Sequence, residues 1–517
     1  MAAETLKAPP PPLEGGLRVL GTLCVSLATF MNVLDTSIAN VSIPAIAGDL
    51  GVSPNQGTWV ITSFAVANAI CVPLTGWLTQ RYGQVRMFIT TTLLFVAASL
   101  LCGLAQSIEM LILFRVVQGA VAGPMIPLSQ TLLLGSYPRE KAGSALATFS
   151  LTILVAPVVG PLLGGWITDN FSWPWIFFIN VPLGLIAAAI TWIIFRSRES
   201  QRVARPIDGV GLLLLVVWVG SLQLMLDKGK DLDWFESKLI VALAATSLLG
   251  FALFLAWELT DEHPVVELRL FARRNFWTGT LSISLSYAAY FGSIVLLPLW
   301  LQQYLGYTAT DAGMILAPVG LLALFLTPVV GRTINRIDPR LFASASLLIF
   351  ASVALMRSHF DTEVDVKTLV LPTLIQGAAV ACFFIPLVSL ALSGLRPDQI
   401  AAASGLNNFM RITAGAFGTS IATTLWESRA TVHHVQLVER VTRSDPAAGD
   451  LLSRLAQAGF TPEQSYGLIN QLVNQQAFTM AALDLFYASA ILLVLLIPLV
   501  WLARPSPHVE DAGAGAH

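Results

Sequence analysis

Long apolar stretches separated by short polar connections run along almost the whole chain. A helix needs about 20 apolar residues to cross the hydrocarbon core of a bilayer, and fourteen stretches approach or exceed that length. The pattern predicts an all-α polytopic membrane protein with 14 transmembrane helices. The expected spans are 18–47, 55–79, 87–105, 109–135, 140–168, 174–196, 209–227, 237–258, 275–301, 310–331, 340–357, 367–393, 401–426 and 478–503.

Composition supports this class and excludes others. Of the 517 residues, 55% are hydrophobic and 12% are charged, whereas soluble proteins carry about 25% charged residues. The net charge of −2 gives no sign of a nucleic-acid partner. The 4 cysteines lie in apolar stretches without the spacing of a disulfide framework or a zinc site. We therefore expect no metal and no cofactor.

Basic residues predict how the chain lies in the membrane. If the N-terminus is cytoplasmic, most of the 29 Lys and Arg residues fall in segments that face the cytoplasm. The positive-inside rule then places both termini in the cytoplasm. The first 17 residues are polar and proline-rich, without a cleavable signal. We expect a multi-pass membrane protein.

Two similar stretches, 113–136 and 371–394, indicate an internal repeat. Both contain Gln-Gly-Ala, at 118–120 and 376–378, followed by Ile-Pro-Leu. Membrane repeats usually enclose a substrate site at their interface. The predicted organisation is pseudo-symmetric (6 + 2 + 6): a disordered cytoplasmic N-terminus at 1–17, an N-terminal six-helix bundle at 18–200, two extra transmembrane helices at 201–262, a C-terminal six-helix bundle at 263–503 and a cytoplasmic tail at 504–517.

Asp35 is the only charged residue between Val19 and Ile46 in the first span. A carboxylate at that depth costs at least ~2.5 kcal/mol, so an intramembrane acid indicates a function. Asn32 and Thr36 share its helix face, and this polar face should turn toward the bundle interior. Arg115 in the fourth span lies at a depth that differs by only about 8 Å. We predict that Arg115 pairs with Asp35.

This pair has two interpretations. It is either a permanent structural ion pair, or the acid takes up a proton when the pair opens and releases it when the pair forms. No His and no other acid lies comparably deep in the first half. We therefore predict that Asp35 and Arg115 couple transport to protons.

Arg411 and Asp484, in spans thirteen and fourteen, form a second candidate pair, either structural or part of the coupling. Other polar side chains within spans are candidates for a substrate cavity, although buried amides also join helices. These candidates are Asn32, Thr36, Asn68, Gln118, Gln130, Tyr287, Tyr290, Gln376, Asn407 and Asn408.

Four stretches resemble motifs of the major facilitator superfamily, specifically its fourteen-span drug:proton antiporter branch. They are LDTSIANVSIPAI at 34–46, GWLTQRYGQVR at 76–86, FRVVQG at 114–119 and APVVGPLLGGWI at 156–167. The superfamily usually has an acid at the position of Gln80, so a charge-based lock in this loop is expected to be weaker here. The resemblance implies gating or antiport roles for Gly76, Arg81, Gly83, Arg86, Pro157, Gly160, Pro161, Gly164 and Gly165.

Residues 427–477 form a long outer segment. Thr461, Pro462 and Gln464 predict a helix that starts with a capping box. The segment is predicted to form an amphipathic hairpin, either a lid over the pathway or a docking surface. Over nearly its whole length the chain resembles the inner-membrane subunits of EmrAB-type tripartite pumps. That resemblance favours docking of a periplasmic adaptor (a membrane fusion protein) and, through it, contact with an outer-membrane channel.

The predicted function is proton-driven efflux of hydrophobic and amphiphilic toxic compounds by alternating access. The alternative on the same fold is a proton-coupled or facilitative importer of a small organic solute. An enzyme is not expected, because the spans contain no His for a hydrolase and the chain has no nucleotide-binding P-loop. Proton-pumping redox subunits carry mid-membrane lysines, which are missing here. The sequence leaves the substrate open.

Overall fold

The computed structural model describes residues 11–504 except 53, 58, 139–140, 203–205, 207, 263, 308, 335, 397–398 and 441–445. Within these residues the chain is helical and contains no strand. Every predicted span coincides with one helix or with two or three consecutive helices. An all-α polytopic architecture is thus confirmed.

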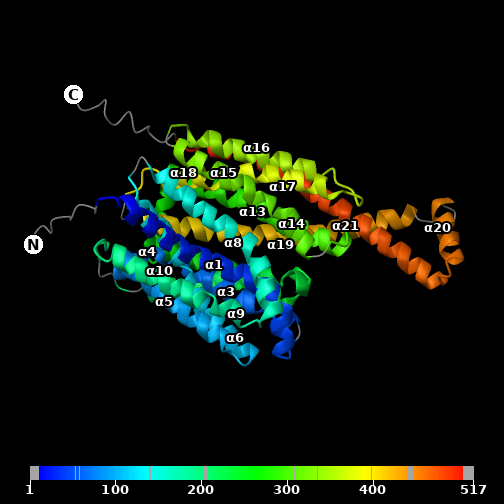
Figure 1. Cartoon of the computed structure of the whole chain (residues 1–517), viewed down its shortest axis with the longest axis horizontal. Helices are drawn as coiled ribbons and strands as arrows, with labels where there is room; N and C mark the ends of the chain where they lie inside the picture. The colour runs from blue at the N-terminus through cyan, green and yellow to red at the C-terminus, as the bar shows by residue number, and fades with distance from the viewer. Residues whose placement is uncertain are drawn as a thin grey trace, which may run out of the picture.

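The first half of the chain forms one bundle, drawn from blue to cyan in the lower part of Figure 1. Three of its six spans are broken into two helices. Its main helices are α1 (Gly15–Asp49), α3 (Trp59–Cys71) with α4 (Thr75–Tyr82), α5 (Gln84–Gly103), α6 (Ile108–Ala122) with α7 (Met125–Ser136), α8 (Ala142–Asn170), and α9 (Trp175–Phe178) with α10 (Asn180–Phe195).

Two extra spans and a second bundle follow. The extra spans are α11 (Gly209–Lys228) and α12 (Lys238–Thr260). The second bundle contains α13 (Arg274–Tyr304), α14 (Ala309–Leu316) with α15 (Pro318–Thr333), α16 (Pro339–Arg357), α17 (Val366–Ala381) with α18 (Phe384–Leu392), α19 (Ile400–Arg440), and α21 (Pro462–Leu495) with α22 (Ile497–Trp501).

The two bundles repeat the same packing. α1 packs along α8 as α13 packs along α19, and α3 packs on α6 as α15 packs on α17. The broken fourth span of each bundle has the same construction. Pro127 is the third residue of α7, and Pro386 is the third residue of α18. The structure therefore contains the internal repeat that the Gln-Gly-Ala stretches predict.

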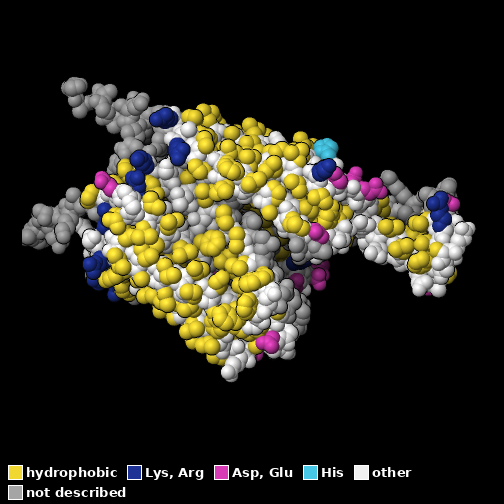
Figure 2. Space-filling view, in the orientation of Figure 1, with side chains coloured by type: hydrophobic (Ala, Val, Ile, Leu, Met, Phe, Trp, Pro, Cys, Tyr) yellow, Lys and Arg dark blue, Asp and Glu magenta, His cyan; other side chains and the backbone are white. Residues whose placement is uncertain are grey.

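Among the described residues, eleven helical segments are long and apolar enough to cross a membrane, and α3 with α4, bent by 61°, brings the number to twelve. The two remaining predicted spans are α8 and α19. α19 has low hydropathy because it carries polar side chains such as Asn407, Asn408 and Arg411, all three of which are buried inside the protein. The face drawn in Figure 2 is mostly hydrophobic, with Lys and Arg side chains gathered near the end where α1 begins.

The extra helices lie beside the boundary between the two bundles. α11 packs on α3 of the first bundle and on α19 of the second. Thr62 on α3 donates a hydrogen bond to the Asp227 carboxylate (2.8 Å), and Ser420 on α19 donates to the carbonyl of Leu226 (3.0 Å). α11 therefore contacts both bundles.

The segment 427–477 projects from the bundle as a helical hairpin, at the right of Figure 1. α19 runs on to Arg440, α20 spans Pro446–Gln457, and α21 begins at Pro462. Thr461 accepts a hydrogen bond from the backbone N–H of Gln464, whose side chain accepts one from the Thr461 N–H. The predicted capping box is confirmed. We call this end of the protein the hairpin end, and the opposite end, where α1 begins and α22 finishes, the termini end.

Candidate functional site

The structure brings Asp35 and Arg115 into direct contact inside the first bundle. Arg115 Nη1 lies 2.5 Å from Asp35 Oδ2, and both side chains are almost completely buried, with 0% of the arginine and 1% of the aspartate exposed. α1 supplies the acid, and α6 supplies the arginine. The ion pair is sealed from solvent in this conformation.

Arg115 is held by further contacts. Its Nε donates to the carbonyl oxygen of Val60 (2.9 Å), and Nη1 also donates to Gln118 Oε1 (2.7 Å). The guanidinium lies 4.2 Å from the centroid of the Phe64 ring, a favourable cation–π distance. Within the described residues, Nη2 has no hydrogen-bond partner. Arg115 is thus fixed by α3 and α6 even apart from the carboxylate.

The Asp35 carboxylate accepts two more hydrogen bonds, from Gln118 Nε2 (3.1 Å) and Asn180 Nδ2 (2.9 Å). Gln118 and Asn180 also both donate to Ser99 Oγ. These donors match the ionised carboxylate, because a carboxylate only accepts. Asn180 and Ser99 are not among the predicted site residues. Asn180 is a polar residue inside the sixth predicted span. A polar side chain within an apolar span is also the property that identifies the other candidates.

The predicted pair of Arg411 and Asp484 does not form, and that prediction is wrong. Asp484 Oδ2 instead contacts Arg429 Nη2 (2.6 Å) and His433 Nε2 (2.8 Å) at the base of the hairpin. The reason is depth. Arg411 and Arg429 are both on α19, and at 1.5 Å per residue they lie roughly 27 Å apart along the helix axis. Because α19 and α21 continue beyond the predicted spans, Asp484 sits much nearer the hairpin end than Arg411.

Arg411 instead lines a small cavity between the two bundles. Gln130, Phe149 and Ser150 line it from α7 and α8, and Phe384, Asn407 and Asn408 line it from α18 and α19. Asn408 Nδ2 donates across the boundary to Gln130 Oε1 (3.3 Å). Three of the predicted cavity residues, Gln130, Asn407 and Asn408, are therefore brought together here.

The other cavity candidates lie elsewhere. Asn32 donates to the carbonyl of Ala122 (3.0 Å), Thr36 donates to the carbonyl of Asn32 (3.4 Å), and Gln118 belongs to the Asp35 network. Tyr290 packs in the core of the second bundle, and Asn68 is partly buried in α3. The Asn32 and Gln118 hydrogen bonds join α1 to α6, whereas the Thr36 hydrogen bond lies within α1. Tyr287 is the exception, because its ring lies against the guanidinium of Arg411 at 4.8 Å.

Arg357, the last residue of the predicted span 340–357, is a buried arginine. It ends α16, is 1% exposed, and donates to Gln376 Oε1 (2.6 Å) and Thr373 Oγ1 (3.2 Å). Thr373 and Gln376 are the repeat equivalents of Arg115 and Gln118. In the second bundle, Gln376, the counterpart of Gln118, therefore also contacts an arginine. This arginine comes from a neighbouring helix, and no acid stands at the position equivalent to Asp35.

The two bundles are closed against each other at the termini end. A Cβ added to Gly76 on α4 would lie 2.6 Å from the Cβ of Ala402 on α19, and one added to Gly331 on α15 would lie 2.8 Å from the Cβ of Ala147 on α8. Both contacts join the first bundle to the second. Residues without side chains are required at these points for the helices to meet.

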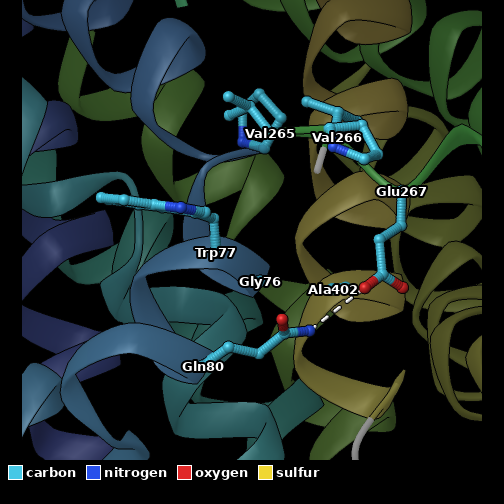
Figure 3. A pocket seen from close by; sticks show the side chains of 9 residues that line it. Gly76, Trp77, Gln80, Val265, Val266, Glu267 and Ala402 are labelled. Atoms are coloured by element: carbon cyan, nitrogen blue, oxygen red, sulfur yellow. Dashed lines mark hydrogen bonds between the residues drawn. The ribbon is translucent and has the colours of Figure 1, made fainter. Parts of the chain in front are cut away.

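A polar contact accompanies this closure, shown with its dashed line in Figure 3. Gln80 Nε2 donates to Glu267 Oε1 (3.1 Å), and Glu267 belongs to the segment that joins the extra helices to α13. The superfamily motif usually has an acid at the position of Gln80. Here Gln80 meets an acid that a different segment supplies, so loop 2 is still tied to the second bundle by a polar contact.

The rest of the loop-2 motif has local roles. Gly83 has a φ of +91°, which favours glycine, and Glu199 accepts hydrogen bonds from the backbone N–H groups of Val85 (2.9 Å) and Arg86 (3.0 Å) at the start of α5. The Arg81 guanidinium lies over the Trp77 ring (5.5 Å). The sequence does not predict the role of Glu199, because its partner residues are distant along the chain.

The glycines of the fifth-span motif differ in what they contact. Cβ atoms added to Gly160 and Gly164 would meet Ser37 and Ile38 of α1, whereas one added to Gly165 would meet nothing within 4 Å. The small-residue surface predicted for this span therefore packs α8 on α1 at Ser37 and Ile38, two and three residues after Asp35. The side chains of Pro157 and Pro161 lie outside the part of the chain that the structure describes.

The sequence profile of the Major Facilitator Superfamily matches residues 25–419. The chain belongs to that superfamily. Multidrug export protein EmrB of Escherichia coli (strain K12) is 50% identical over 507 residues, covering 98% of this chain and 99% of that protein. Fatty acid resistance protein FarB of Neisseria gonorrhoeae is 48% identical over 507 residues, with the same coverage. Both similarities extend over nearly the whole chain.

Solved structures agree on the fold. The proton:xylose symporter XylE aligns with a TM-score of 0.58 and 13% sequence identity, covering 96% of this chain and 98% of the other. The predicted major facilitator fold and the predicted family resemblance are confirmed. As a member of this superfamily the chain is a multi-pass membrane transporter.

The closure at the termini end leads to a testable expectation for Gly76. We expect Gly76→Val to reduce transport roughly tenfold or more, because the added atoms overpack the contact with Ala402 and penalise the closed state. The matched control is Gly320→Val, at a glycine where an added Cβ meets nothing within 4 Å. Transport in vesicles, normalised to the amount of inserted protein, measures the effect. Equal transport by both variants would show that this contact is not needed.

Proposed function

We propose that this transporter exports hydrophobic and amphiphilic toxic compounds in exchange for protons. The observation that carries the proposal is the buried Asp35–Arg115 pair, which lies where α1, α6 and α10 meet. Opening of the pair exposes a carboxylate that can bind a proton, and reclosure onto the arginine favours its release. The relative named as a multidrug export protein supports drug-like substrates.

The proposed cycle is alternating access by rocking of the two bundles. The glycine contacts Gly76–Ala402 and Gly331–Ala147 close the termini end, and they separate when that side opens. The packing of Gly160 and Gly164 on α1 gives a direct mechanical route from movement of α8 to the environment of Asp35. Proton binding and the opening of one side are thereby linked.

In this proposal the protein resides in the bacterial inner membrane with the termini end in the cytoplasm. The Lys and Arg side chains near the termini end in Figure 2 support this orientation. The hairpin then lies in the periplasm. A proton gradient across the membrane supplies the driving force, and no cofactor is involved.

We further propose that the hairpin docks a periplasmic adaptor of the EmrA-like membrane fusion class, which connects the pump to a TolC-like outer-membrane channel. Figure 1 shows the hairpin projecting away from the bundle, which suits docking better than a lid. Apolar side chains on it are exposed, among them Val435, Val438, Tyr466 and Leu472. Exposed apolar side chains outside the lipid-facing surface are typical of binding sites.

The docking proposal is tested by replacing residues 438–466 with a short Gly/Ser linker. This deletion keeps Trp426, Arg429, His433 and Asp484, which anchor α19 to α21. We expect substrate uptake into inside-out vesicles to remain near the wild-type level, while co-purification of the adaptor and drug resistance of whole cells are lost. Full resistance without the hairpin would refute docking, whereas lost vesicle transport would favour a lid.

The direction of transport distinguishes efflux from the alternative importer. Intact cells that produce the protein are loaded with a fluorescent hydrophobic substrate, and the proton gradient is then collapsed. Efflux predicts that the cellular content rises after collapse. A proton-coupled importer predicts that it falls, and a facilitative importer predicts no dependence on the gradient.

A further inference from the structure

A second buried carboxylate lies at the termini end, away from Asp35. Glu258, in the last turn of α12, is 2% exposed. Its Oε2 accepts a hydrogen bond from the backbone N–H of Val266 (3.1 Å), whereas Oε1 is buried and has no hydrogen-bond partner among the described residues. An ionised carboxylate is costly in such a place unless a cation accompanies it. The burial of Glu258 therefore requires an explanation.

Another acid lies beside this oxygen. Asp208 caps the start of α11, where its Oδ1 accepts a hydrogen bond from the Gly211 N–H (2.9 Å). A Cβ added to Gly211 would lie 2.7 Å from Glu258 Oε1 and would collide with Asp208 Oδ2. The unpartnered oxygen of Glu258 and Oδ2 of Asp208 are therefore neighbours on the same side of Gly211. Two negative charges placed so close together repel each other, and one proton between them removes the repulsion.

The surroundings indicate which of the two acids holds that proton. Asp208 is partly exposed, and its Oδ2 accepts a further hydrogen bond from Trp257 Nε1 (2.9 Å). Its place at a helix N-terminus also favours a negative charge. Glu258 is more deeply buried, and its Oε1 has no donor. A proton on Glu258 Oε1 makes the group neutral and supplies an O–H that can donate to Asp208 Oδ2.

The charged groups around Glu258 favour the same arrangement. The charges that act on it are those of Asp208 and of Asp261, the residue that follows α12, and both are negative. The segment after α12 packs back on this helix and carries Glu267 and Arg269. Within the described part of the chain, neither Glu258 nor Asp208 forms a salt bridge with Arg269 or with any other cation.

This pair of acids is joined to the closure drawn in Figure 3. Val266, whose N–H holds Glu258, is followed directly by Glu267, which accepts the hydrogen bond from Gln80 of the first bundle. Val266 also belongs to an apolar cluster that contains residues of both bundles. Separation of the bundles at this end rearranges the cluster, and with it the backbone group that holds Glu258.

We propose that Glu258 and Asp208 form a second proton-binding site, which holds one proton while the termini end is closed and releases it when that end opens. The closed state then binds this proton more tightly than the open state. It is therefore stabilised at low pH and loses that stabilisation as the pH at the termini end rises. In the proposed orientation an acidic cytoplasm keeps the transporter closed on that side, which limits further proton entry. Only this last step rests on the proposed function.

Infrared difference titration of the purified full-length protein in lipid nanodiscs detects the proton through the C=O stretch of protonated carboxylic acids. We expect a wild-type signal that titrates well above about pH 4.3, the ordinary value for glutamate, and that Glu258→Gln lacks. Asp208→Asn keeps a residue that caps a helix but removes the neighbouring charge. It should lower the midpoint of this titration by about one pH unit or more. The matched control is Glu262→Gln, which removes an exposed acid of the same segment and should leave the signal unchanged.

The link to closure is tested with spin labels on Thr90→Cys of α5 and Leu341→Cys of α16, two exposed positions near the termini end of different bundles. The 4 native cysteines are buried or partly buried, and protein without introduced cysteines gives the background. Label distances are measured in the Asp35→Asn background, so that Asp35 does not contribute. The population with the longer distance should increase severalfold from acidic to alkaline pH. Glu258→Gln resembles the protonated acid and should stay closed throughout, whereas Glu262→Gln should respond normally.

Equal infrared titrations of wild-type protein and Glu258→Gln would overturn the proton site, as would an unchanged midpoint in Asp208→Asn. An unchanged pH response of the label distance in Glu258→Gln would overturn the link to closure. Neither measurement uses a substrate or a proton gradient, so these results would leave efflux driven through Asp35 standing.

Discussion

Asp35→Asn is expected to abolish proton-driven transport while the protein remains folded and inserted. An amide cannot take up and release a proton near neutral pH, so the coupling step is lost. Arg115 keeps its hydrogen bonds to Val60 and Gln118 and its contact with the Phe64 ring. Asn180 Oδ1 has no hydrogen-bond partner among the described residues, so the Asn180 amide can rotate to accept a hydrogen bond from the amide that replaces the carboxylate.

Substrate-induced proton release from the purified protein measures this effect directly. Wild-type protein should release protons when a substrate is added in weakly buffered solution, and Asp35→Asn should release none. Substrate binding itself should persist, because Asp35 does not line the cavity beside Arg411. The matched control is Asp49→Asn, an acid at the end of α1 that accepts a hydrogen bond from Trp173 Nε1 (2.7 Å). Undiminished proton release from Asp35→Asn would exclude this carboxylate as the carrier.

Much of the architecture can be predicted from the sequence, because the membrane imposes a length on each span. The internal repeat is also visible, since the fourth span of each bundle needs the same residues at its break. The contact of Asp35 with Arg115 is predictable for a physical reason. Two opposite charges at similar depth in an apolar bundle have few other partners. Hydrophobicity and helix geometry alone therefore narrow the choice of a partner for Asp35.

The contacts that the sequence does not predict depend on where helices end. α19 and α21 extend beyond the apolar stretches. Asp484 therefore contacts Arg429 and His433, whereas the predicted spans suggest Arg411 as its partner. Arg357 ends a predicted span and a helix, yet its side chain is buried against Gln376. The length of an apolar stretch shows which residues cross the membrane. It does not show where a helix ends or in which direction a side chain points.

Partners supplied by distant segments are also hidden in the sequence. Gln80 stands where the motif usually has an acid, but the Glu267 carboxylate lies within hydrogen-bond distance of the Gln80 side chain. Glu199 holds the start of α5 in a similar way. Neither acid lies in a recognisable motif, because its role is defined only by the fold. Motif comparison therefore underestimates the polar contacts at the termini end.

Arg115→Ala is expected to damage stability as well as transport, and more severely than Asp35→Asn. Removal of the guanidinium leaves the Asp35 carboxylate buried with only the neutral donors Gln118 and Asn180. Breaking a buried ion pair from one side costs about 3–5 kcal/mol. Arg115→Lys keeps the charge but cannot reach Val60, Gln118 and Asp35 with one planar group, so partial activity is expected.

The double variant Asp35→Asn/Arg115→Ala separates the two interpretations of the pair. Because the uncompensated carboxylate is removed, most of the stability lost in Arg115→Ala should return, whereas transport should remain absent. Thermal unfolding in detergent and vesicle transport are measured on all four proteins of the cycle. A purely structural pair predicts instead that transport recovers together with stability. Normal transport by Arg115→Ala alone would remove the arginine from the mechanism, and the proton site would then depend on Asp35 with its amide neighbours.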